Sequence, residues 1–126
     1  MTRAIRLLAS LAVLFMLVGC ATQGKYSWGG YDQALYDYYK HPSDSAEYMA
    51  ALRKAIDGAA AARKPVAPGI CAEYGYMLLQ QQKTDDAVHY FQLEKQYWPE
   101  SAQFMDGMIR TAHLGNKPVV EEGAAS

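Results

Sequence analysis

The sequence predicts an all-α fold in which two antiparallel helix pairs are followed by a capping helix. Apolar residues recur at helical spacing in successive stretches, as Tyr31, Leu35 and Tyr38 do in the first. Proline follows several of these stretches, for example at Pro42 and Pro99. Because proline lacks an N–H and disfavours helical geometry in the residue before it, a helix is expected to end there. No useful length of sequence alternates polar and apolar residues, so no sheet is expected.

The first helix pair is expected within residues 31–63, and His41-Pro42 marks the end of its first helix. Asp44 and Glu47 have the spacing of a capping box at the start of the second helix. The apolar stripe of that helix comprises Tyr48, Leu52, Ile56 and Ala59. Gly58 costs about 1 kcal/mol relative to alanine inside a helix, and a close helix crossing is expected to offset that cost.

The second pair, within residues 68–101, carries the clearest pattern. Its signature residues are Tyr74, Gly75, Leu78, Ala87, Phe91 and Pro99. Their spacing resembles the tetratricopeptide repeat, a helix–turn–helix unit of about 34 residues. Cys71 departs from the repeat, which usually has an aromatic residue there, and Glu94 departs where a small residue is usual.

Packing explains why the repeat uses these residue types. Gly75 has no side chain, so the second helix of the pair can approach where the small Ala87 meets it. Phe91 is expected to fill the space further along, and Thr84 to supply an N-cap oxygen.

A further helix is expected to cover the open end of this array, because a stacked face otherwise stays in water. Ser101 is predicted to cap it, and Gly115-Asn116 to end it. Its apolar face comprises Phe104, Met105, Met108, Ile109 and Ala112. The repeat-like domain is thus predicted over 30–116, with a disordered tail over 117–126.

The N-terminus predicts a lipoprotein signal peptide over residues 1–19. Arg3 and Arg6 precede an apolar run over 7–18, which is shorter than the roughly 20 residues of a membrane span. The sequence Leu-Val-Gly-Cys ending at Cys20 resembles the lipobox of bacterial lipoproteins. In that family the peptidase cuts before the cysteine, whose sulfur receives diacylglycerol and whose amine is acylated. An ordinary signal peptide or a single membrane span is the alternative.

The resemblance also bears on location. Ala21 is not the aspartate that retains enterobacterial lipoproteins at the inner membrane, so the periplasmic face of the outer membrane is expected. Residues 20–29 are small and polar and predict a lipidated tether. Tyr26 and Trp28 could alternatively rest among the lipid headgroups.

No constellation of catalytic or metal-ligating residues is evident. His41, His89 and His113 lack the spacing of a metal site, and Cys71 is expected to lie in the core. The mature chain would carry a net charge of about −3 without a basic stripe, so nucleic acid is not an expected partner. We therefore expect no enzymatic activity, no metal, no cofactor and no small-molecule substrate.

The chain has ten tyrosines, more than a small core needs. Tyr31, Tyr48 and Tyr74 are expected to pack in the core. Tyrosine and tryptophan are enriched at interfaces because they combine an apolar ring with a polar group. The residues predicted to contact a partner are Tyr36, Tyr39, Tyr76, Tyr90 and Trp98.

Taken together, these features resemble a family of small proteobacterial lipoproteins carried as a domain of unknown function. The residues of the front half that carry this resemblance are Trp28, Gly29, Tyr31, Leu35 and Tyr39, and those of the rear half are Gly75, Leu78, Ala87, Phe91 and Pro99. Members are found alongside a curli-secretion-type (CsgG-like) lipoprotein and a third small lipoprotein, so the resemblance implies an accessory role in an outer-membrane assembly.

Three functions are compatible with these observations. The first is a non-enzymatic adaptor that binds another envelope lipoprotein or an outer-membrane oligomer. The second is a pilotin-like chaperone for a secretion or pilus subunit, and the third is an envelope enzyme or an activator of a cell-wall enzyme. The absence of paired acid and base groups in the sequence disfavours the third.

Overall fold

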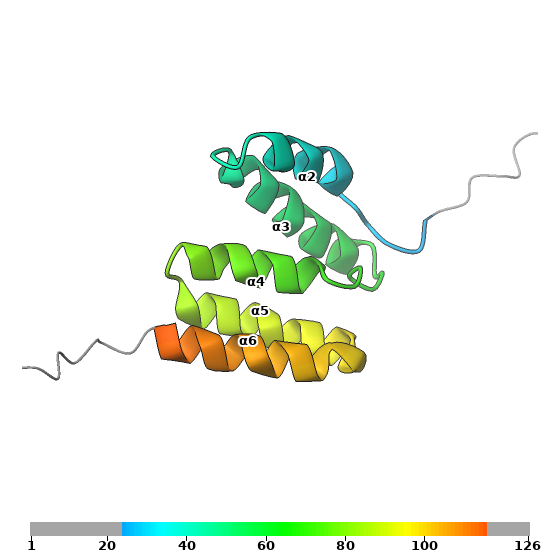
Figure 1. Ribbon diagram of the computed structural model, residues 1–126. Coiled ribbons are helices and arrows are strands. Elements are labelled where there is room, and N and C mark those ends of the chain that lie inside the picture. Colours follow the sequence, from blue (N-terminus) through cyan, green and yellow to red (C-terminus); the bar gives the residue numbers. More distant parts are fainter. Residues whose placement is uncertain (1–23, 116–126) are drawn as a thin grey trace, which may run out of the picture.

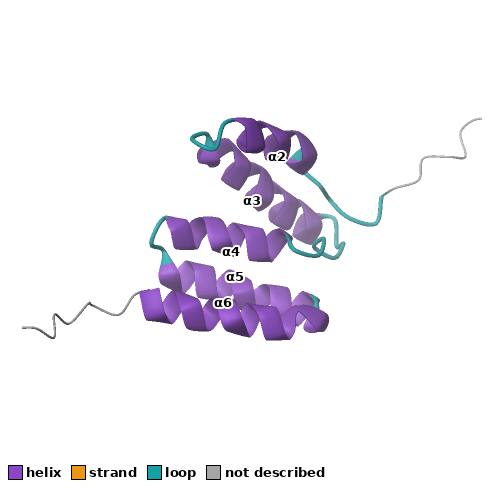
Figure 2. Cartoon of the chain, in the orientation of Figure 1, coloured by secondary structure: helices purple, strands orange, loops and turns teal. Residues whose placement is uncertain are grey.

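The computed structural model describes residues 24–115 of the 126-residue chain (Figure 1). Within this range all regular secondary structure is helical, and the helices are joined by short loops (Figure 2). The helices are α2 (Tyr31–Lys40), α3 (Ser45–Ala61), α4 (Ile70–Gln80), α5 (Thr84–Tyr97), the 3₁₀ turn η1 (Pro99–Ser101) and α6 (Ala102–Gly115). The predicted all-α class is confirmed. The predicted signal peptide, Cys20 and the tail over 117–126 lie outside the described residues.

The helices stack in the order of the chain. Each α-helix packs against the next one, from α2 on α3 through to α5 on α6. Figure 1 shows two helical hairpins, α2–α3 and α4–α5, with α6 lying along α5 as the last member of the array. The two ends of the described chain lie on opposite sides of this stack (Figure 1).

The α4–α5 hairpin is held by the residues of the repeat pattern. A Cβ atom added to Gly75 would lie 2.8 Å from Cε1 of Phe91 and 3.1 Å from the carbonyl oxygen of Ala87. Ala87 and Phe91 are fully buried, and Leu78 is buried beside them. Helix α5 ends at Tyr97, two residues before Pro99, where the next turn begins. Gly75 and Ala87 thus meet Phe91 within the hairpin, in the arrangement that their sequence spacing predicts.

The core consists of two adjoining clusters of buried side chains. One joins the first hairpin to α4 and includes Tyr48 and Leu52, and the other joins α4, α5 and α6 around Phe91. The half-buried residues that pack against both clusters are Met49, Tyr74 and Tyr90. Because these residues bridge the clusters, the two hairpins share one continuous apolar interior.

The predicted side-chain caps are wrong. Asp44 occupies the N-cap position of α3 but makes no capping hydrogen bond, and its carboxylate accepts one from the Ser43 hydroxyl instead. Thr84 is the first residue of α5 rather than its N-cap, and its side chain is buried. The Ser101 hydroxyl donates to the carbonyl oxygen of Trp98, 2.7 Å away, and so stabilises the turn before α6.

The described part of the predicted tether, residues 24–29, packs against α3 instead of hanging free. Gly29 has a φ of +57°, and a Cβ there would lie 3.0 Å from the backbone nitrogen of Ala55. A Cβ on Gly58 would lie 2.7 Å from the Ser27 hydroxyl oxygen, so Gly58 makes room for this segment and not for a helix crossing. We call residues 24–30 the N-terminal segment. It belongs to the domain, which therefore begins before residue 30.

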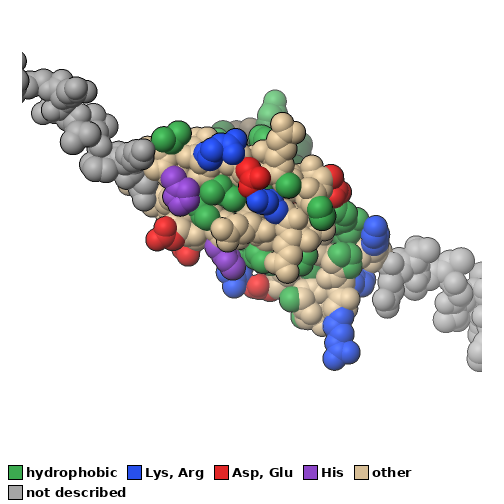
Figure 3. Space-filling view, turned by 90° about the horizontal axis from the view of Figure 1, so that it is seen from below, with side chains coloured by type: hydrophobic (Ala, Val, Ile, Leu, Met, Phe, Trp, Pro, Cys, Tyr) green, Lys and Arg blue, Asp and Glu red, His purple; other side chains and the backbone are tan. Residues whose placement is uncertain are grey.

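The packed faces of α3 and α6 differ in part from the predicted stripes. In α3, Ala55 is buried whereas Ile56 is only half-buried. In α6, Met105 and Ala112 are buried, but 68% of Phe104 is exposed. The lower surface of the molecule mixes hydrophobic and charged side chains, as expected for the outer face of a terminal helix (Figure 3).

A candidate protein-binding groove

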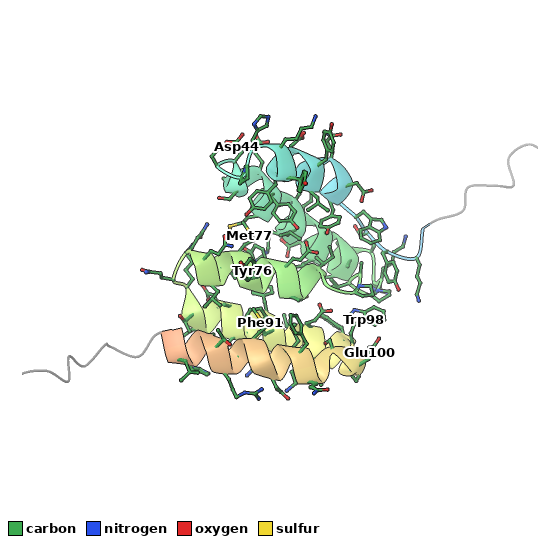
Figure 4. All side chains as sticks on the ribbon, in the orientation of Figure 1. Asp44, Tyr76, Met77, Phe91, Trp98 and Glu100 are labelled. Carbon is green, nitrogen blue, oxygen red and sulfur yellow. The ribbon has the colours of Figure 1, made fainter. Side chains whose placement is uncertain are left out.

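An apolar groove of about 360 Å³ opens on the surface of the array. It is lined by Tyr38, Tyr48, Ala72, Glu73, Tyr76, Met77, Phe91, Phe104, Met105 and Met108. These residues come from all five α-helices of the described range, so the groove crosses from the first hairpin to the terminal helix. Figure 4 shows Tyr76, Met77 and Phe91 in the middle of the molecule, between the first hairpin and α6.

The walls of the groove follow from the helical repeat of the sequence. On the first hairpin, the rings of Tyr38 and Tyr48 stack with centroids 4.8 Å apart and an angle of 7° between their planes. On α6, Phe104 and Met108 are four residues apart and so lie on one face of the helix. Successive turns of α4 supply the floor between these two walls.

Glu73 is the charged residue of the lining, and its carboxylate is held by two tyrosines. The Tyr31 hydroxyl lies 3.0 Å from each Glu73 oxygen, and the Tyr48 hydroxyl also donates to Oε2. Burial raises the pKa of both tyrosines, and the hydrogen bonds to Glu73 raise it further. Both phenols therefore remain protonated donors across the physiological pH range, and they fix the carboxylate at the side of the groove.

This cluster predicts a loss of stability at alkaline pH. Because the folded state raises the pKa of Tyr48, the unfolded chain ionises first as the pH passes about 10, and the free energy of unfolding falls from there upward. Urea unfolding at about pH 8 and about pH 10.5 should show this fall, and Tyr48→Phe should reduce it. An equal fall in the variant would contradict the assignment to Tyr48.

The structure separates the residues predicted to contact a partner. Tyr76 is 49% exposed and lines the groove. Tyr36 and Tyr39 are exposed on α2 but lie outside the lining. Tyr90 and Trp98 are half-buried and hydrogen-bonded within the domain. Of these five residues, only Tyr76 lines the groove. That all five contact a partner stays a prediction.

The two half-buried residues have structural roles. The Tyr90 hydroxyl accepts a hydrogen bond of 2.9 Å from Nη1 of Arg53, and its ring meets Tyr74 edge-on with centroids 4.6 Å apart. Nε1 of Trp98 donates to the carbonyl oxygen of Val66, 3.2 Å away. Tyr90 thus joins α5 to α3, and Trp98 joins the end of α5 to the loop before α4.

The principal groove residues missed by sequence reasoning are on α6. The sequence predicts that Phe104 and Met108 belong to a packed apolar stripe. In the structure Met105 and Ala112 of that stripe are buried, whereas Phe104 is exposed. An available signal is the width of that stripe, which exceeds what contact with one neighbouring helix requires. Methionine is also common at adaptable binding surfaces, because its side chain is flexible and polarisable.

Cys71 is buried as predicted, and burial together with the nearby Glu94 carboxylate raises the pKa of its thiol to about 12. The thiol is therefore protonated and unreactive at neutral pH. Within residues 24–115 no three His, Cys, Asp or Glu side chains gather where a metal could bind. No helix in that range has both the length and the hydropathy needed to cross a membrane.

Comparison with known proteins places the whole groove inside one family match. No curated protein and no solved structure matches the chain. The family model of a domain of unknown function, DUF4810, matches residues 25–108, which run from the N-terminal segment to the last groove residue of α6. The chain therefore belongs to the DUF4810 family.

Proposed function

We propose that this protein is a non-enzymatic adaptor that binds another envelope protein in the groove. A lipid on Cys20 would hold it on the periplasmic face of the outer membrane. The observation that carries the proposal is the apolar groove across α2–α6, whose rim leaves large aromatic side chains in water.

The groove has the composition of a protein-binding surface. Phe104 and Tyr76, at 68% and 49% exposure, stand beside a recessed floor that includes Met77 and Phe91. Aromatic and methionine side chains are enriched at interfaces, and grooves between helices commonly receive the apolar face of a partner helix. Glu73 adds one fixed negative charge, so a partner segment with apolar anchors and a basic residue is the best complement.

The membrane part of the proposal rests on the sequence. The basic start, the apolar run over 7–18 and the Leu-Val-Gly-Cys motif ending at Cys20 support lipidation, and Ala21 supports sorting to the outer membrane. Acyl chains contribute about 0.8 kcal/mol per buried methylene, so several together anchor a protein stably. By the resemblance described above, a CsgG-like lipoprotein is the partner we propose.

Crosslinking in intact cells tests the adaptor role. The full-length protein should be recovered with one envelope partner after mild crosslinking and detergent solubilisation. Phe104→Glu and Tyr76→Ala should each reduce the recovered partner by more than about tenfold, because a few large aromatic side chains carry most of the binding energy of an interface. Tyr39→Ala is the matched control, since Tyr39 is 84% exposed and lies outside the groove. Equal recovery with all variants would contradict the groove assignment.

Deletion of the gene separates the adaptor from the chaperone. Loss of an adaptor should leave the partner assembled in the outer membrane but inactive. An outer-membrane oligomer that is mislocalised after deletion would contradict the adaptor role and favour the pilotin-like role.

A further inference from the structure

A cluster of aromatic and basic side chains lies at the side of the array where the described chain begins. The ring of Tyr26 meets the ring of Trp28 at 5.9 Å and that of Trp98 at 6.3 Å, both near edge-on. The ammonium group of Lys25 lies 5.1 Å from the centre of the Tyr26 ring. Lys64, at the end of the first hairpin, donates a 2.9 Å hydrogen bond to the carbonyl oxygen of Gly24. We call Lys25, Tyr26, Trp28, Lys64 and Trp98 the aromatic–basic cluster.

We propose that this cluster rests on the phospholipid headgroups of the membrane in which Cys20 is anchored. The inference rests on the lipid anchor of the proposed function. It adds a second, non-covalent contact with the bilayer, which would fix the orientation of the domain instead of leaving it free on a tether.

The short chain length between the anchor and the cluster supports this occupant. Cys20 and Gly24 are four residues apart, and four residues span at most about 14 Å when fully extended. The N-terminal segment is packed against α3 through Gly29 and tied to Lys64 through Gly24. A lipidated Cys20 would therefore hold Gly24, which adjoins Lys25 and Tyr26 of the cluster, within about 14 Å of the anchored residue at the membrane surface.

The chemistry of the cluster matches that surface. Tryptophan and tyrosine concentrate at membrane interfaces because one end of the ring system is apolar and the other is polar. Trp28 is 42% exposed although its neighbours Tyr26 and Tyr31 pack on the core. Lysine and arginine near the surface attract anionic lipids.

Basic side chains accompany these rings. Arg63, next to Lys64, is exposed, and Lys25 is exposed on the N-terminal segment. The acidic Glu100 lies near Trp98 in Figure 4, so the surface is mixed rather than purely basic. None of the cluster residues lines the groove, and the membrane contact would therefore leave the groove free for a protein partner.

Fluorescence of the reconstituted protein tests this contact. Trp28 and Trp98 are the two tryptophans of the chain, so its tryptophan emission reports on the cluster alone. The lipidated full-length protein would be placed in vesicles of phosphatidylethanolamine and phosphatidylglycerol that carry a quencher at headgroup depth. We expect a blue shift relative to detergent and quenching of at least about one third of the emission. Trp28→Phe should remove most of the quenching, because the ring of Trp98 is more shielded.

A charge variant and a flotation assay distinguish failure of the headgroup contact from failure of the lipid anchor. The triple variant Lys25→Gln, Arg63→Gln, Lys64→Gln should lower the quenching at least about twofold, because each cation near the surface adds attraction to anionic lipid. Lys40→Gln, at the C-terminal end of α2, is the control and should leave the quenching unchanged. Protein that floats with the vesicles without quenching would overturn the contact but keep the anchor. Protein that does not float would overturn the anchor and the contact together.

Discussion

Replacing Phe91 by alanine should lower the free energy of unfolding by about 3–5 kcal/mol, the usual cost of removing a buried aromatic side chain. Phe91 is fully buried, its ring occupies the space that Gly75 leaves open, and it joins α4, α5 and α6 in one cluster. A small domain typically has only about 5–15 kcal/mol of stability, so this loss is a large fraction of the total. Urea unfolding followed by far-ultraviolet circular dichroism would measure it.

Phe104→Ala is the matched control for this prediction. It removes the same side chain from the neighbouring helix, but 68% of Phe104 is exposed, so the change should stay within about 0.5 kcal/mol. Similar losses for the two variants would contradict the packing described for the α4–α5 hairpin. A difference as large as expected would also show that Phe104 can be changed in binding experiments without unfolding the domain.

The second large effect is expected at Glu94. Its replacement by alanine should lower the free energy of unfolding by about 1–3 kcal/mol. Glu94 is buried, with only 3% of its surface exposed. Its Oε1 accepts a 2.7 Å hydrogen bond from the backbone N–H of Gly69, at the start of α4. The carboxylate thus caps α4 from the neighbouring helix, where the backbone N–H groups need an acceptor. Glu94→Gln retains an acceptor and should lose less stability than Glu94→Ala.

The pH dependence of stability distinguishes the charge of Glu94 from its hydrogen bond. Burial raises the pKa of Glu94, although the backbone N–H groups of Gly69, Ala72 and Cys71 oppose that rise. Its other oxygen, Oε2, has no hydrogen-bond partner in the described part of the chain. Because the folded state holds the proton more tightly, this residue makes stability fall as the pH rises from 4.5 through the raised pKa.

Unfolding of the wild type and Glu94→Gln across about pH 4–7 would measure this contribution as a difference between the two curves. The wild type should lose more stability over this range than the glutamine variant. Parallel curves would mean that the charge of Glu94 does not influence folding.

The α4–α5 hairpin could be predicted because its pattern reports contacts between adjacent helices. Gly75, Ala87 and Phe91 meet within one hairpin, so their sequence spacing is enough to place them together. The departures at Cys71 and Glu94 had no explanation when each was considered alone. In the structure they are neighbours at the start of α4, where the small thiol and the long carboxylate together occupy buried space.

The groove could not be predicted in the same way, because it depends on how α6 and the first hairpin are placed around α4. An apolar stripe shows that a face avoids water but not whether a neighbour covers all of it, and Phe104 is the case in which it does not. At the N-terminal segment, the prediction of a tether from composition was wrong for the described residues. Small polar residues indicate a flexible linker, yet Ser27 and Gly29 fit closely against α3.

The stacking order has a consequence for how the chain acquires its structure. Every α-helix packs on its immediate neighbour in the sequence, so a polypeptide emerging N-terminus first can complete each interhelical contact as soon as the next helix is available. Local contacts of this kind favour rapid folding. The pairing of Tyr26 with Trp98 is a contact of longer range, because it joins the beginning of the domain to the end of α5 and must wait until that helix has been released.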